Sequence, residues 1–77
     1  MFLKIKDVLV DVDKYRRIWV EDAYSALDGK WSKIVGDDET IVFIKSDEVQ
    51  KEFEKISDAL AFRYRTELLK NQIMELI

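Results

Sequence analysis

The spacing of hydrophobic residues changes near residue 46. Residues 2–45 contain short runs in which apolar and polar residues alternate, a pattern typical of half-buried strands. From Ser46 to Ile77 the apolar residues recur at steps of three and four, without Gly or Pro, which predicts one long amphipathic helix. The pattern predicts an α+β protein forming one domain over residues 1–77. Residues 1–45 are expected to form a meander of four or five short antiparallel strands, and residues 46–77 the C-terminal helix.

Three turns divide the strand region. The apolar positions change parity near Lys6-Asp7, so a tight bend is expected there. Asp28-Gly29 predicts a hairpin turn, because Gly tolerates the positive φ of such turns, and residues 36–39 predict another. The strand at 40–45 is apolar on both faces, and one helix covers only one of them. A helix at 14–27, a curled sheet or a partner chain must therefore cover the other face.

Residues 14–27 fit two patterns. Ile18 and Val20 alternate with Arg17 and Trp19, as in a strand. The same stretch also has apolar residues at helical spacing, which gives the alternative order β-α-β-β-α. Periodicity alone leaves both interpretations open.

Two parts of the chain carry a resemblance to a group of known proteins. They are the opening run Phe2-Leu3-Lys4-Ile5 with residues 8–15 and Ile18, and the later run Thr40-Ile41-Val42-Phe43 with residues 46–48 and 53–56. Together they resemble small proteins of bacteria and their phages that are built as a strand meander closed by one helix. The resemblance covers most of residues 1–60. It implies a strand at residues 17–21 but does not imply an activity, and residues 61–77 depart from the pattern.

Composition argues against most catalytic chemistry. The chain has 77 residues, a net charge of −3, no cysteine, no histidine and two glycines. The usual general base, the thiol nucleophile and the two commonest transition-metal ligands are therefore missing. No phosphate-binding glycine motif occurs. We expect a non-enzymatic protein without a cofactor or metal.

The predicted C-terminal helix is too long for its domain. Its 32 residues span roughly 47 Å, against about 30 Å for a compact domain of this length. The helix is expected either to extend past the sheet or to break near Ser57-Asp58, where both side chains can compete for backbone hydrogen bonds. A second apolar stripe would need a covering chain, so we expect a homodimer or higher oligomer. Its residues are Phe62, Leu69, Ile73 and Leu76.

Two clusters combine arginine with aromatic residues. Tyr15, Arg17 and Trp19 share one face if they lie in a strand, and Arg63 and Arg65 flank Tyr64 in the helix. Such pairs are common at binding hot spots and at sites that stack bases or hold phosphate.

We therefore expect a non-catalytic, self-associating module that binds another protein through these residues. A phage-type inhibitor of a host system is one example that fits this expectation. The alternatives are a binder of nucleotides or single-stranded nucleic acid at the same arginines, and a structural assembly subunit. No signal peptide or apolar run near the ~20 residues of a membrane span is visible, so a cytoplasmic location without a membrane partner is expected.

Overall fold

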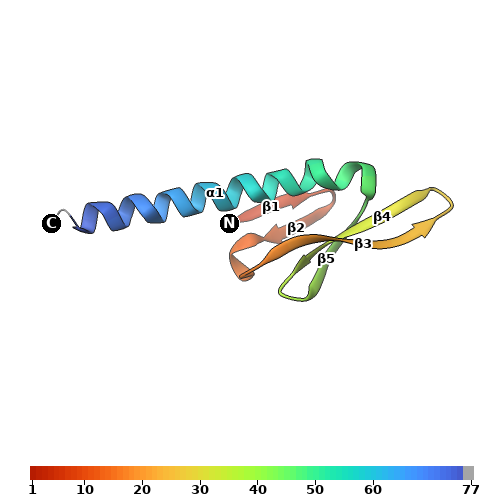
Figure 1. Ribbon diagram of the computed structural model, residues 1–77, viewed down its shortest axis with the longest axis horizontal. Helices are drawn as coiled ribbons and strands as arrows, with labels where there is room; N and C mark the ends of the chain where they lie inside the picture. Colours follow the sequence, from red (N-terminus) through yellow and green to blue (C-terminus); the bar gives the residue numbers. More distant parts are fainter. Residues whose placement is uncertain (76–77) are drawn as a thin grey trace.

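Five antiparallel strands in two sheets precede one long C-terminal helix (Figure 1). The computed structural model describes residues 1–75, with side chains described up to residue 65. The elements are β1 (Phe2–Ile5), β2 (Val8–Asp11), a 3₁₀ turn η1 (Val12–Lys14), β3 (Ile18–Ala26), β4 (Gly29–Gly36), β5 (Glu39–Lys45) and α1 (Ser46–Glu75). The predicted α+β class is confirmed, with the strands divided between a β1–β2 hairpin and a three-stranded sheet in the order β3-β4-β5.

The β1–β2 hairpin follows the predicted change of parity. Leu3 lies opposite Val10 and Ile5 lies opposite Val8, so the apolar residues of both strands share one face. Lys6 lies in the turn with a φ of 54°, a left-handed conformation that a residue with a Cβ seldom adopts. This tight turn shifts the apolar face by one residue between the two strands.

Residues 18–26 form a strand, so the alternative helix at 14–27 is wrong. Ile18 and Val20 pack against the core, while Trp19 lies opposite Val35 and outside that core cluster. The register shifts between Asp22 and Tyr24, which is a β-bulge. The apolar residues of this stretch also have helical spacing, but pairing of β3 with β4 along its whole length makes the stretch a strand.

The two later turns lie close to their predicted positions. Ala26 pairs with Gly29, so the β3–β4 loop residues are Leu27 and Asp28, one residue earlier than expected. Gly29 has a φ of 122°, and this is the positive φ for which a glycine was expected at this turn. Asp37 and Asp38 connect β4 to β5 with φ values of 47° and 70°, as a two-residue turn with both central residues left-handed requires.

The core lies between the two sheets and the first half of α1. Its buried members are Ile5, Val10, Val12, Ile34, Ile44, Val49 and Ile56. Ser32 is also buried and shares a 2.7 Å hydrogen bond with the hydroxyl of Ser46 at the start of α1. This bond satisfies a polar group that would otherwise be costly to bury.

Helix α1 is unbroken over 30 residues, so the proposed break at Ser57-Asp58 does not occur. Both side chains are exposed, and the neighbouring Ile56 is fully buried in the core. Packing of this face outweighs the weak local preference of Ser and Asp for non-helical backbone. The molecule measures 60 × 21 × 18 Å, and in Figure 1 the helix continues well past the strands.

The apolar residues of α1 that recur at steps of three and four pack in or against the core from Val49 to Leu60, whereas the next residue of that series, Tyr64, is 65% exposed. No helix in the described part of the chain is both long and apolar enough to cross a membrane.

Candidate interaction surface

The β3–β5 sheet has one packed face and one open face. In β4, Ser32 and Ile34 point into the core and are buried, so Trp31 and Lys33 point the opposite way. Helix α1 and the β1–β2 hairpin lie on the core side of this sheet (Figure 1). Of the apolar residues at 41–44 of β5, Phe43 lies on the open face beside Lys33, whereas Ile44 belongs to the core and Ile41 and Val42 pack against it. Phe43 is 48% exposed, so no described element covers it fully.

Three aromatic side chains, which we call the aromatic cluster, occupy the open face. Tyr24 lies directly opposite Trp31 in the strand register, and their rings stack with centroids 5.9 Å apart and planes inclined by 18°. The ring of Phe43 lies 5.8 Å from that of Tyr24. Tyr24 is 50% exposed and Phe43 is 48% exposed. Cross-strand aromatic pairs of this kind stabilise a sheet and also leave a broad apolar surface.

Polar contacts hold Trp31 in place at the rim of the cluster. Its indole N–H donates a 3.0 Å hydrogen bond to Asp28, and the ammonium group of Lys45 lies 5.9 Å from the ring centroid. The hydrogen bond from Trp31, with the nearby Lys45, lowers the pKa of Asp28. The adjacent turn residue Leu27 is fully exposed at the tip of the projecting β3–β4 hairpin.

A second feature, which we call the arginine pocket, lies near the β4–β5 turn. It has a volume of about 390 Å³ and is lined by Arg16, Arg17, Trp19, Asp37 and Asp38. The Asp37 carboxylate accepts hydrogen bonds from the backbone N–H groups of Arg16 (3.0 and 3.1 Å) and Arg17 (2.9 Å). Neither guanidinium group has a carboxylate within 4.0 Å among the described residues. The two arginines therefore remain available to a ligand.

The pH dependence of stability should reveal the role of Asp37. The N–H groups of Arg17 and Arg16 lower its pKa in the folded state. Its contribution to stability is therefore present above the usual aspartate pKa and is lost as the pH falls through the lower, folded value. We expect Asp37→Asn to be less stable than the wild type at pH 7, with the difference shrinking in acid. Chemical denaturation at several pH values measures this.

Asp38→Asn is the matched control for that measurement. It removes the same charge from the same turn, and asparagine also tolerates the left-handed backbone that both positions adopt. Equal pH profiles for the two variants would show that the backbone hydrogen bonds of Asp37 do not produce the effect.

The predicted binding residues divide between separate places. Arg17 and Trp19 line the arginine pocket, whereas Tyr15 packs against the core and lies against Gly36. Arg63 points from α1 toward η1 and donates a 2.8 Å hydrogen bond to Asp13. Arg65 is exposed.

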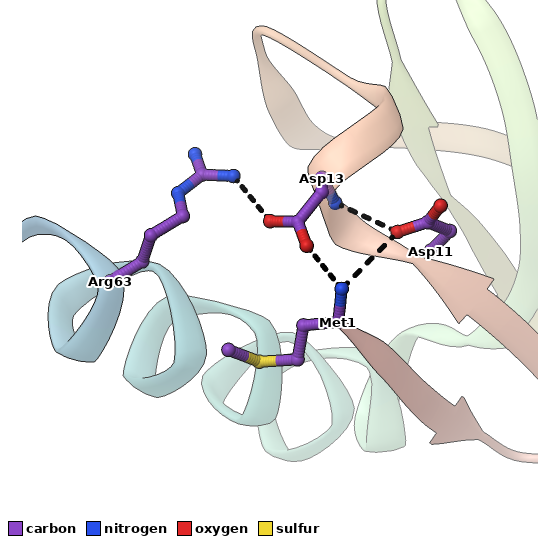
Figure 2. A network of polar contacts seen from close by, with 4 residues as sticks. All are labelled: Met1, Asp11, Asp13 and Arg63. Carbon is purple, nitrogen blue, oxygen red and sulfur yellow. Dashed lines mark hydrogen bonds and ion pairs between the residues drawn. The ribbon is translucent and has the colours of Figure 1, made fainter.

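Asp13 joins the N-terminus to α1 (Figure 2). Its carboxylate binds the Met1 amino group as well as Arg63, and Asp11 lies 3.5 Å from the same amino group. The amino group and Arg63 together lower the pKa of Asp13. Arg63 thus holds the helix against the strand layers and is separate from the arginine pocket.

The predicted self-association residues lie on the distal part of α1. Phe62 is 67% exposed. The side chains of Leu69 and Ile73, and the whole of Leu76, lie outside what the structure describes. Within residues 1–65 no group of three or more acidic residues is arranged to hold a metal ion.

Sequence reasoning did not identify Tyr24, Phe43 or Leu27 as surface residues. The signal for Phe43 was present in the doubly apolar run at 41–44, but the run does not say which residue faces outward. That depends on the pairing with β4, in which Ile44 lies opposite the buried Ser32 and Phe43 lies opposite Lys33 on the other face.

Comparisons of the chain with protein-family models, with curated proteins and with solved structures gave no match. The candidate surfaces therefore rest on the geometry alone.

Proposed function

We propose that the protein is a non-catalytic, self-associating interaction module. Its distal helix pairs with a second copy, and its open sheet face binds another protein. The length of α1 beyond the strands is the observation that carries the proposal. Leu60 is the last helix residue with a described side chain in contact with the core, and α1 continues to Glu75, about 22 Å farther along its axis.

A helix that extends into water needs packing to stay stable. Isolated helical segments of this length are marginal in water, and most helical stability in proteins comes from burying one apolar face. The segment contains the apolar residues Leu68, Leu69 and Ile73 in its sequence. A second copy of the chain supplies a matching apolar stripe and allows both helices to be buried together.

The open face suits a protein partner better than a nucleic acid. Aromatic residues dominate the centres of protein interfaces, and Tyr24, Trp31 and Phe43 form such a group. Residues 18–45, which comprise the three strands and their turns, carry six acidic residues against three basic ones, and this excess opposes the backbone of a nucleic acid. The arginine pocket supports the nucleotide alternative less well, because Asp37 and Asp38 line it together with the two arginines.

Replacing Leu69 and Ile73 together by Asp should dissociate the oligomer and leave a folded monomer. Burying two carboxylates in an apolar helix interface is costly, whereas a monomer exposes them to water. Light scattering across a dilution series measures the mass, which should fall to the 9.2 kDa of one chain. Circular dichroism checks that the fold persists.

The matched control places the same two charges on polar positions of the same segment. Asn71→Asp with Gln72→Asp should leave the mass unchanged. If both double variants keep the wild-type mass, the distal helix is not the interface and the proposed function fails.

A further inference from the structure

Strand β5 has an unpaired edge. Within the three-stranded sheet its one neighbour is β4. In the described residues, no hydrogen bond from a side chain or from backbone outside the sheet reaches the other edge of Glu39–Lys45. Half of the N–H and C=O groups of an edge strand point outward, so this edge is a template for another strand.

The other edges carry features that oppose strand pairing. Edge strand β3 has Glu21 and Asp22 at its centre and a bulge next to them, and a second β3 alongside it would bring like charges together. Strands β1 and β2 are only four residues long. These are the means by which proteins prevent association through sheet edges.

The centre of β5 has no charged side chain that would oppose pairing with another strand. Its five central residues, 40–44, are uncharged and favour strands, and its one irregularity is a bulge near Ile41. Thr40 and Phe43 are exposed along this strand. The only charged residues of β5 are Glu39 at its start and Lys45 at its end.

We propose that β5 pairs antiparallel with β5 of a second copy, which joins the two three-stranded sheets into one of six strands. The inference deepens the proposed self-association and uses a different surface from the distal helix. Charge complementarity identifies the occupant and the direction. Antiparallel pairing brings the Glu39 end of each copy to the partner's Lys45, whereas parallel pairing brings like charges together.

The regular part of β5 places Phe43 near the two-fold axis. Centred there, Phe43 lies beside the partner's Phe43, and Val42 lies beside the partner's Ile44. Lys45 then lies diagonally across from the partner's Glu39, within reach of a long side chain. The pairs that these residues form within one chain, Lys14–Glu39 at 3.9 Å and Lys45–Asp28 at 3.6 Å, are long and exposed, so they are readily exchanged.

Such pairing also extends the aromatic cluster. Phe43 lies at the β5 side of the cluster formed with Tyr24 and Trp31. Two clusters meeting at the two-fold axis form one continuous apolar surface across both copies. Combined with the helix interface, two different two-fold contacts on one chain would produce a tetramer or a longer assembly.

Charge reversal tests the edge directly. Glu39→Lys leaves both ends of β5 basic, and Lys45→Glu leaves both ends acidic. Both are made in the Leu69→Asp/Ile73→Asp background, so that β5 is the only proposed contact remaining. We expect that background to be the 9.2 kDa monomer when dilute and to dimerise only at high concentration. Each charge variant alone should raise the dissociation constant of that dimer about tenfold, and the two variants mixed in equal amounts should form heterodimers. Analytical ultracentrifugation measures all three.

The mixture separates interface effects from structural damage, because damaged strands would not recover on mixing. Failure of the mixture to associate more strongly than either variant overturns the β5 proposal. A background that is a strict monomer while the wild type is a dimer also overturns it, but supports the helix interface. A wild-type chain that is monomeric at every concentration overturns both proposals.

Discussion

Gly36→Ala is expected to destabilise the fold by about 2 kcal/mol, although alanine is normally tolerated in strands. An ideal Cβ at Gly36 would lie 2.5 Å from Cδ1 and 2.7 Å from Cγ of the Tyr15 ring. It would also lie 2.9 Å from Cδ1 of Ile41, which is the end of a flexible side chain. The ring cannot bend, so either the ring or the β4 backbone must move. For a domain of this length the melting temperature should fall by about 10 °C, which thermal unfolding followed by circular dichroism measures.

A double-mutant cycle with Tyr15→Ala identifies the cause. Removing the ring should itself cost stability, because Tyr15 packs against the core. In that background, however, Gly36→Ala should have little further effect, since the contact that it strains is gone. An equal cost of Gly36→Ala in both backgrounds would show that the Tyr15 ring is not responsible.

The same contact places Tyr15 in the core rather than beside Arg17 and Trp19, where the sequence pattern predicts it. Tyr15, Arg17 and Trp19 alternate correctly for one face of a strand, but β3 begins only at Ile18. Tyr15 lies before it, in extended backbone after η1, and packs against a glycine 21 residues later in the chain. The absence of a side chain at Gly36 makes room for the ring. Nothing in the local pattern indicates that pairing.

Local features were predictable where neighbours along the chain determine them. The change of parity at Lys6-Asp7 follows from alternation, and the turn at Asp37-Asp38 follows from residues that tolerate left-handed backbone. The start of the helix at Ser46 was also predicted. Each of these depends on interactions within a few residues.

Features that depend on contacts between distant parts of the chain were not predictable from the local pattern. The helical and strand interpretations of residues 14–27 differ only in which partner buries the apolar side chains, and that partner is β4. Arg63 was assigned with Arg17 to one surface, but Asp13, 50 residues away, binds it instead. The length of α1 was visible in the sequence. Its continuity past Ser57-Asp58 depends on burial of Ile56, which only the packed structure shows.

Ile56→Ala is expected to have the largest effect, a loss of about 3 kcal/mol in the free energy of unfolding. Ile56 is fully buried in the same core cluster as Ile5 and Ile34, so it joins α1 to both sheets. Truncation leaves a cavity where the helix, the β1–β2 hairpin and β4 meet. A domain of this length has a stability of roughly 4–12 kcal/mol, so the loss is a large fraction of the total. Urea denaturation measures it, with Glu54→Ala on the exposed side of the same helix turn as the control, which should change stability by less than about 0.5 kcal/mol.

The unfolding transition of the Ile56→Ala variant tests whether α1 and the sheets unfold together. Helix content followed at 222 nm reports mainly α1, whereas tryptophan fluorescence reports Trp19 and Trp31, which both lie in the three-stranded sheet. Because Ile56 packs against both layers, the two signals should change together in the variant, as expected for one cooperative unit. If the helix signal is lost first, α1 is held less firmly than its burial indicates. The distal helix would then have no fixed orientation relative to β5, and the two proposed contacts could not build a defined assembly.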